Sequence, residues 1–371
     1  MRVEFFKHSI GDEEIDAVVE VLKSRFLTTG EKNRQLEEML SDYLGVPHAL
    51  TTSSCTSALH MALMALSVGK GDRVVVPALT FMATANVVIH TGATPLFVDV
   101  DRDTGLMDLN HLKDVLKRQR VKVVIPVHIY GQMVDMHALE ELSEKYGFYI
   151  VEDSAHNVEG FRRGVKPGQK SDFACFSFYA TKNITSGEGG AIVFRDGKYY
   201  DYLKMMRIHG MSLSASERYG KFVDYDMPFP GWKYNMTSFQ AAMLIPQLKK
   251  IESLWSRRKE IAEKYYRELG DMAFPRIIEE QDTRSAYHLL GILVENRKVV
   301  AQKIVSKGVG ISSHYSKPVP LLQWYRETFG FKRGDFPGAE YIADRIITLP
   351  LYPSLTDEEQ DYVIEVVKQS V

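Results

Sequence analysis

The sequence has few cysteines and no long apolar run, and these absences exclude several classes of protein. Its 371 residues contain only two cysteines, Cys55 and Cys175, which cannot stabilise a chain of this length by disulfides. We expect both to be free thiols in a reducing compartment, and no Cys/His cluster has the spacing of a zinc site. No stretch approaches the roughly 18 consecutive apolar residues of a membrane-spanning helix. The acidic N-terminus, MRVEFFKHSIGDEE, is unlike a signal peptide, so we expect a cytoplasmic protein with no membrane partner and no metal.

The chain also lacks an excess of charge of either sign. Lysine and arginine number 46 and aspartate and glutamate 48, which gives a formal net charge of −2. No basic run marks a nucleic-acid surface, so we expect no nucleic-acid partner. Hydrophobic residues make up 45% and charged residues 25%, which is globular composition and excludes a disordered or collagen-like chain. At about 150 residues per domain, the length favours two domains.

The first 200 residues alternate between strand-like and helical patterns. The strand-like segments are apolar on both faces and are separated by helices, which predicts a parallel or mixed sheet covered by helices, an α/β fold. We expect strands at 73–77, 95–100, 121–127, 148–152, 172–178 and 190–194, the last two close enough to be antiparallel. We expect helices near 15–22, 36–44, 58–66, 81–90, 109–117 and 136–146. The first of them carries one apolar face, formed by Ile15, Val18, Val19 and Leu22, behind a cap at Asp12.

The pattern changes near residue 245. Residues 248–269 read as one long helix with a charged face, which suits a connector between domains. A strand at 287–294, a helix at 299–307 and a final helix after Thr356 follow, and Thr356 with Glu359 fits a capping box. The sequence therefore predicts a large domain over 1–247 and a smaller C-terminal α/β domain over 248–371.

An acidic residue stands at the end of one expected strand. The strand 148–152 runs directly into Asp153 in the segment VEDSAH. Ligands of α/β sheets bind beyond the carboxyl ends of the strands, so a carboxylate here is well placed for function. A helix-capping aspartate is as ordinary at such a position, and His156 could equally face solvent. Neither residue decides the function by itself.

A lysine in the next segment changes this balance. Lys182 lies in FSFYATKNITSGEGG, between an aromatic-rich strand and a glycine-rich turn, and follows Asp153 by 29 residues. A lysine in such a pocket loses its proton readily and can form a Schiff base with a carbonyl. Pyridoxal phosphate requires this pair, a lysine for its aldehyde and an aspartate for its pyridinium nitrogen. We therefore expect both side chains to meet at one edge of the sheet.

The other needs of this cofactor can also be met. The segment TTSSCTS precedes a predicted helix, so Thr56 and Ser57 stand where helix N–H groups could bind a phosphate, although a plain helix cap explains them as well. Ser177 adds a hydroxyl nearby. Phe81 follows the strand 73–77 and could stack on the cofactor ring, whereas a lone phenylalanine is more often part of the core.

Taken together, VEDSAH, SFYATKNITSGEGG, SSCTSALHMAL and PALTFMATANVV resemble the DegT/DnrJ/EryC1/StrS family of sugar aminotransferases. The resemblance extends from LTTGEKNRQLEEMLSDYLG through GWKYNMTSFQAAM to LPLYPSLT. It implies the fold-type I aminotransferase architecture, with a three-layer α/β/α large domain, a small C-terminal domain and a homodimer. It also implies pyridoxal 5′-phosphate as the cofactor.

The resemblance assigns roles to individual residues. Lys182 matches the lysine that holds the cofactor, and Asp153 matches the residue that partners its ring nitrogen. His156 matches the residue beside the phenolic oxygen, and Phe81 matches the aromatic residue that stacks on the ring. The positions that match the phosphate-binding residues are Thr56, Ser57 and Ser177. Glu188 in GEGG matches a position close to the substrate.

One segment departs from the family pattern. Many members have Gly-Tyr-Asn-Tyr-Arg, whose asparagine reaches the cofactor phosphate of the partner subunit, and this chain has GWKYN instead. Lys233 stands at the asparagine position and Asn235 at the arginine position, and either could make the contact. A similar GYKYN occurs in the branch that acts on UDP-linked 4-keto pentoses and related sugars.

The implied reaction is amino transfer from L-glutamate to a 4-keto nucleotide sugar, UDP-linked, in amino-sugar or polysaccharide biosynthesis. Amination of a 3-keto sugar and a non-catalytic regulatory protein that binds the cofactor are the alternatives. Sugar dehydration in this family replaces the lysine by histidine, so Lys182 argues against it. A doubly wound nucleotide-binding enzyme is disfavoured because no GxGxxG or GxxxxGK[ST] follows a strand. On the substrate side we expect His314 and Tyr315, and Arg207 is as consistent with a substrate contact as with a structural role.

Overall fold

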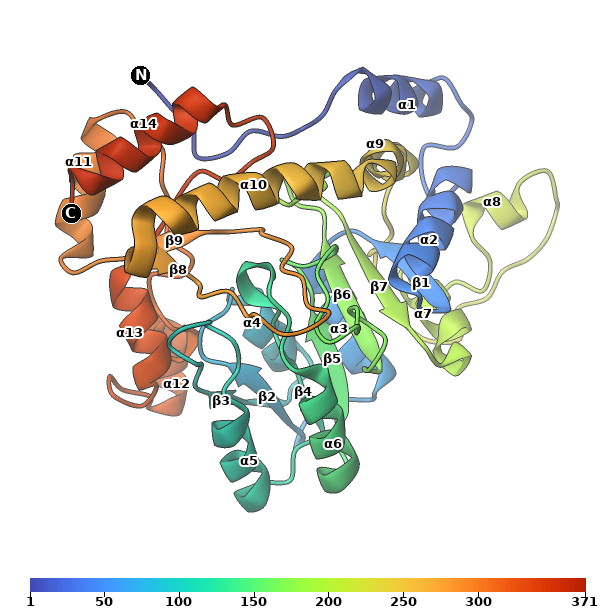
Figure 1. Ribbon diagram of the computed structural model, residues 1–371. Helices are drawn as coiled ribbons and strands as arrows, with labels where there is room; N and C mark the ends of the chain where they lie inside the picture. The colour runs from blue at the N-terminus through green and yellow to red at the C-terminus, as the bar shows by residue number, and fades with distance from the viewer.

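The computed structural model describes the backbone of residues 1–371 and the side chains of all of them except 215 and 216. Its centre is a seven-stranded sheet with the order β1-β7-β6-β5-β4-β2-β3 (Figure 1). The strands are β1 (His48–Thr52), β2 (Arg73–Pro77), β3 (Thr94–Val98), β4 (Val123–Val124), β5 (Tyr149–Asp153), β6 (Phe173–Ser177) and β7 (Gly190–Phe194). All neighbouring pairs are parallel except those of β7, which is antiparallel to β6 and β1. The predicted mixed, mostly parallel sheet is confirmed.

Helices cover both faces of this sheet and make three layers. Along β6 and β7, Cys175 and Ile192 pack into the core cluster that contains α3, whereas Phe176 and Val193 pack into the cluster of α2 and α9. This alternation follows from the two-residue repeat of a strand. The helices of this part are α2 (Glu31–Leu44), α3 (Cys55–Ala65), α4 (Ala83–His90), α5 (Leu109–Arg118), α6 (Met136–Tyr146), α7 (Tyr200–Met206), α8 (Ala215–Arg218) and α9 (Ser238–Lys249).

The C-terminal part has a sheet and a core of its own. Its three antiparallel strands have the order β10-β9-β8 and span β8 (Ala273–Phe274), β9 (Gly291–Leu293) and β10 (Ile346–Thr348). The surrounding helices are α10 (Ile251–Leu269), α11 (Arg297–Ser306), α12 (Gln323–Phe329), α13 (Pro337–Arg345) and α14 (Asp357–Lys368). Thr356 and Glu359 form the predicted capping box. In Figure 1, α10 runs across the top of the sheet and leads to these elements. A domain boundary after residue 247 stays a prediction.

Several predicted elements differ from the structure, and of the strand expected over 287–294 only Gly291–Leu293 forms β9. The helix expected over 248–269 is interrupted at Lys250, whose φ of −102° and ψ of 13° separate α9 from α10. The ammonium of Lys250 pairs with the buried carboxylate of Glu14 at 2.6 Å, a tertiary contact that the local charge pattern does not encode. The strand expected over 121–127 is limited to two residues in β4 because Pro126 has no N–H for the ladder.

The first helix, α1 (Asp12–Leu22), begins behind Gly11 rather than behind Asp12. The N–H of Gly11 donates to the carboxylate of Glu14, 2.7 Å away. Its apolar stripe does not face the core of this chain, since Ile15, Val19 and Leu22 are 53%, 37% and 58% exposed. The predicted apolar face is therefore largely on the surface of the single chain. Among the described residues, no helix combines the length and apolarity needed to cross a membrane.

Candidate active site

A cavity of about 570 Å³ lies at the carboxyl ends of the parallel strands. Loops that leave β1, β2, β4, β5 and β6 meet there, together with the start of β7, whose opposite direction brings its N-terminal end to the same edge. The C-terminal part and the N-terminal segment close the other side. The predicted site residues that line the cavity are Thr56, Phe81, Asp153, His156, Ser177, Lys182, Glu188, His314 and Tyr315.

Asp153 is the last residue of β5 and is only 5% exposed. Its Oδ2 accepts the hydroxyl of Thr84 at 2.7 Å, and its Oδ1 accepts the N–H of Ala155 at 3.1 Å. The described segment 154–172 contains no helix, so Asp153 is not a helix cap. The carboxylate is fixed by these donors and is turned toward the cavity, where a positively charged partner would stabilise it.

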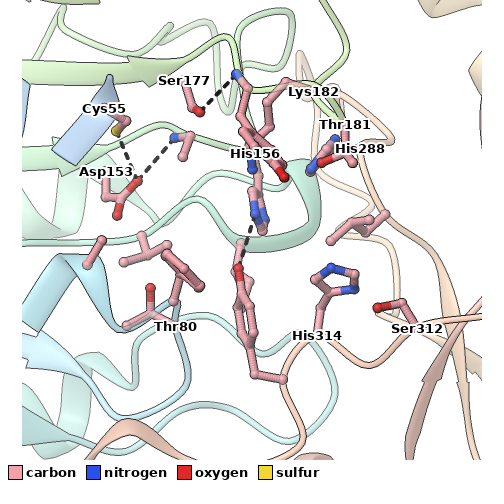
Figure 2. A pocket seen from close by; sticks show the side chains of 18 of the residues that line it. Cys55, Thr80, Asp153, His156, Ser177, Thr181, Lys182, His288, Ser312 and His314 are labelled. Atoms are coloured by element: carbon pink, nitrogen blue, oxygen red, sulfur yellow. Dashed lines mark hydrogen bonds between the residues drawn. The ribbon is translucent and has the colours of Figure 1, made fainter. Parts of the chain in front are cut away.

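Lys182 extends into the same cavity from the loop after β6, and Figure 2 shows Asp153, Lys182 and His156 around one opening. Burial lowers the pKa of the Lys182 ammonium from 10.5 to about 8, although the carboxylate of Asp153 acts in the opposite direction. Such a lysine is neutral much more often than one on the surface. It is therefore suited to act as a nucleophile or a base.

The protonation of His156 follows from its contacts. The backbone N–H of Tyr130 donates to Nδ1 of His156 at 3.3 Å, so this nitrogen carries no proton. Burial, reinforced by the charge of Lys182, lowers the pKa of His156 well below its ordinary 6.5, so the ring is neutral. The proton of the neutral ring is then on Nε2, which lies 3.4 Å from the hydroxyl of Tyr315. His156 thus offers one N–H donor to the cavity.

The N-terminus of α3 provides an anion site in the same cavity. Ser54 caps this helix, and its hydroxyl accepts the N–H of Ser57 at 3.1 Å. The N–H groups of Cys55 and Thr56, the first two helical residues, have no partner within the helix. A side chain at Gly190 would lie 2.3 Å from the backbone of Ser54, so only glycine lets β7 approach this turn. The free N–H groups and the helix dipole favour an anion such as a phosphate.

Ser57 itself does not line the cavity, contrary to its assignment as a phosphate-binding residue. Its side chain is 3% exposed, and its hydroxyl donates to the carbonyl of Ser54 at 2.7 Å. The reason is that the capping box uses both the N–H and the hydroxyl of this residue. Thr56 is exposed toward the cavity, and Ser177 lines it as well.

The remaining cavity residues form an aromatic and imidazole wall. Phe81 is 52% exposed and its ring centroid lies 6.0 Å from that of Tyr315, so it is not a core residue. Nδ1 of His314 lies 3.0 Å from the hydroxyl of Thr348, and burial lowers the pKa of His314 to about 4. Glu188 is exposed, and its carbonyl accepts the amide of Gln240 at 2.7 Å.

Three other residues lie away from this cavity. Arg207 is 4% exposed and donates to Glu37 at 2.6 Å and to the carbonyl of Thr51 at 2.7 Å, which makes its role structural. Lys233 is exposed, and the amide of Asn235 donates to the hydroxyl of Thr28 at 2.8 Å. Neither Lys233 nor Asn235 lines the cavity of its own chain.

Sequence reasoning missed cavity residues that come from distant segments: Phe5, Phe6, His288 and Ser312. The N-terminal phenylalanines are brought in because Val3 pairs with Val309. A side chain at Gly310 would lie 2.5 Å from the backbone N of Phe5, so glycine permits this approach. No local pattern marks any of these residues, since contacts between remote segments create their position.

Comparison with known proteins identifies the family. Residues 8–368 match the DegT/DnrJ/EryC1/StrS aminotransferase family. The Bacillus subtilis spore coat polysaccharide biosynthesis protein SpsC is 38% identical over 374 residues, which are 98% of this chain and 95% of SpsC. The structure of Spr1654 from Streptococcus pneumoniae in its PMP-form is 34% identical, with a TM-score of 0.91 over 99% of this chain and 98% of Spr1654.

Helicobacter pylori PseC, an aminotransferase involved in the biosynthesis of pseudoaminic acid, is 28% identical, with a TM-score of 0.92 over 100% of this chain and 99% of PseC. The solved structures thus share the large α/β/α part and the C-terminal part alike. Because the family match and the relatives both extend over nearly the whole chain, this protein belongs to the DegT/DnrJ/EryC1/StrS aminotransferase family.

Proposed function

We propose that the protein uses pyridoxal phosphate to transfer an amino group from L-glutamate to the 4-keto group of a UDP-linked sugar. The observation that carries this proposal is the placement of Asp153 and Lys182 in one cavity, together with the free N-terminus of α3. The relatives support it, since Spr1654 has a structure in a PMP-form, PseC acts in pseudoaminic acid biosynthesis and SpsC in spore coat polysaccharide biosynthesis.

The residues present fit this cofactor. Lys182 would bind the aldehyde of the cofactor, and the carboxylate of Asp153 would pair with its ring nitrogen. Phe81 would stack on the face of its ring. Its phosphate would be bound by the N–H groups of Cys55 and Thr56 and by the hydroxyl of Ser177. Its phenolic oxygen would accept a hydrogen bond from Nε2–H of His156. When bound, pyridoxal phosphate supplies an electron sink for the bonds at the amino-bearing carbon.

The lowered pKa of Lys182 lets it serve as the base. With a pKa of about 8, roughly one lysine in ten is neutral at pH 7, against about one in 3,000 at the ordinary value. The neutral Nζ can take the proton from the α-carbon of the amino donor and return it within the cavity. The donors Thr84 and Ala155 keep the carboxylate of Asp153 aligned toward the place of the ring nitrogen.

The proposed enzyme is a homodimer with shared active sites. Several large apolar side chains of the excursion after α8 are exposed in the single chain, namely Tyr219, Phe222, Val223, Tyr225 and Met227. In Figure 1 this excursion projects from the body of the molecule beyond α7. Together with the exposed stripe of α1, these side chains are the kind of surface that a second copy covers. Lys233 or Asn235 would then reach the cofactor phosphate of the partner subunit.

A panel of substrates tests the proposed function. The purified holoenzyme is mixed with L-glutamate and with UDP-, dTDP- or GDP-linked 4-keto or 3-keto sugars, and 2-oxoglutarate and amino sugar are measured. We expect the fastest turnover with a UDP-linked 4-keto sugar. Amination of a 3-keto sugar alone would replace the proposed substrate. Absence of any half-reaction with amino acids would contradict the proposed enzyme and favour a regulatory role.

A further inference from the structure

A buried polar chain leads from α10 to the cavity. The guanidinium of Arg258 pairs with the carboxylate of Glu159, and both side chains are almost completely buried. The amide of Asn183 donates to Oε1 and Oε2 of Glu159 at 3.1 and 3.2 Å. On its other side, Oδ1 of Asn183 lies 2.9 Å from Nδ1 of His288, which lines the cavity. Asn183 directly follows Lys182, so this chain ends beside the lysine.

These contacts fix the orientation of the Asn183 amide. Its Nδ2 faces the Glu159 carboxylate and also the carbonyl of Ala286 at 3.1 Å, and both of these partners only accept hydrogen bonds. The oxygen of the amide must therefore face His288. Because an amide oxygen can only accept, Nδ1 of His288 carries the proton and donates it.

The protonation of His288 then determines what it offers to the cavity. Burial lowers the pKa of His288 well below 6.5, and the charges of Lys182 and Arg258 and the neighbouring His314 act in the same direction. The ring is neutral with its single proton on Nδ1, so Nε2 has a free lone pair. Its ring centroid lies 4.5 Å from that of His156, which has the opposite tautomer. His156 thus offers an N–H donor to the cavity, and His288 offers an acceptor nitrogen.

We propose that Asn183 is a positioning residue that holds His288 in the Nδ1–H tautomer, so that Nε2 of His288 accepts a hydrogen bond from the amino group of Lys182. This inference rests on the proposed function, in which that amino group must be free to carry a proton. It is supported by a small void that adjoins the cavity and that Lys182, Asn183 and His288 line together. Nε2 of His288 orients the amino group of Lys182, and the lone pair of this amino group stays free to take the substrate proton.

The tautomer can be measured without any reaction. Long-range ¹H–¹⁵N NMR spectra of the cofactor-free full-length protein, labelled with ¹⁵N-histidine, distinguish a protonated from a bare ring nitrogen. We expect Nδ1–H and bare Nε2 for His288, assigned by its absence in His288→Gln. Asn183→Ala should shift His288 toward the other tautomer, whereas the control Asn110→Ala on the exposed surface of α5 should not. An unchanged tautomer in Asn183→Ala would overturn the role of Asn183.

Two substitutions of His288 separate its two nitrogens. The amide of glutamine reaches the place of Nε2 and can still accept there, whereas the amide of asparagine lies at the place of Nδ1 and leaves the Nε2 position empty. In single turnovers with any reactive amino acid, we expect His288→Asn to slow the half-reaction by about a hundredfold and His288→Gln by less than about tenfold. The isotope effect with α-deuterated donor should increase only in His288→Asn, and cofactor affinity, measured by absorbance titration, should stay the same.

The outcomes separate this inference from the proposed function. Equal rates and equal isotope effects in the two His288 variants would overturn the role of Nε2. If no keto sugar is aminated but the tautomer and the half-reaction behave as expected, the proposed substrate fails and the inference stands. If either His288 variant unfolds, Asn183→Ala provides the same kinetic test, because it leaves the His288 ring in place.

Discussion

The hydroxyl of Thr84 on α4 donates to Oδ2 of Asp153 at the end of β5, over 2.7 Å. The hydroxyl of Thr80 lies 2.9 Å from that of Thr84 and can donate to it in turn. Because α4 follows β2 and Asp153 ends β5, this contact joins two strand ends across the sheet edge and fixes the plane of the carboxylate. The ring nitrogen of the proposed cofactor would face this fixed carboxylate.

The first prediction concerns Asp153 and its hydrogen-bond donor Thr84. Asp153→Asn removes the charge that would keep a ring nitrogen protonated, with little change in shape. We expect the half-reaction with glutamate to slow by several orders of magnitude while the protein still folds. Thr84→Val removes one hydrogen bond to a charged group and should slow the reaction about ten- to hundredfold. Thr91→Val, at the C-terminal end of the same helix, serves as the control. A near-normal rate in Asp153→Asn would show that its charge has no role in the reaction.

The second prediction concerns the pH dependence of Lys182. Because its pKa is lowered to about 8, the reactive neutral amine is populated above this pH and becomes tenfold rarer with each unit below it. We expect the rate at which the cofactor-free protein captures pyridoxal phosphate to rise up to about pH 8 and then to level off. Borohydride should fix the captured cofactor to Lys182 in peptide maps, and Lys182→Ala should lose all transamination. A rate that rises to pH 10 or an adduct on another lysine would contradict the assignment.

The third prediction tests the structural role of Arg207. Arg207→Met leaves the carboxylate of Glu37, which is 9% exposed, without its positive partner. We expect the free energy of unfolding to fall by about 3 kcal/mol in urea denaturation, with an unchanged KM for the sugar. Arg276→Met, whose side chain is 68% exposed, is the matched control and should change stability by less than about 0.5 kcal/mol. A large increase in KM with unchanged stability would restore Arg207 to the substrate site.

Much of the fold and the meeting of Asp153 with Lys182 could be predicted because both depend on local patterns. Apolar strands separated by helices define a parallel sheet, and parallel strands place their carboxyl ends at one edge. Ser57 could not be resolved in this way, since a helix cap and a phosphate site have the same sequence pattern. His288 and Phe5 enter the cavity through long-range pairing of segments that have no signal of their own. The exposed stripe of α1 shows a similar limit, because its pattern indicates burial without saying against which chain.

The last prediction is that two subunits share each active site. Lys233 and Asn235 do not line the cavity of their own chain, and Oδ1 of Asn235 is buried without a hydrogen-bond partner in the described part of the structure. A contact from this segment to the cofactor phosphate of the partner subunit would explain why a basic or amide group stands at residues 231–235. The carbonyl of Tyr234 accepts the N–H of Ser53 at 2.6 Å, which holds this segment beside the turn that precedes α3.

Subunit mixing tests this arrangement. Lys182→Ala and the double variant Lys233→Ala with Asn235→Ala should each be inactive as homodimers. In a mixed dimer with shared sites, one site carries both defects and the other carries neither. Random exchange should therefore restore about a quarter of the wild-type activity, measured as glutamate-dependent amino-sugar formation after mixing. Mixing Lys182→Ala with Asp153→Asn is the control and should restore nothing, because both defects belong to the same chain's side of the cavity. If native mass spectrometry proves exchange and the activity still does not return, the sites are not shared, and the exposed side chains after α8 serve another contact.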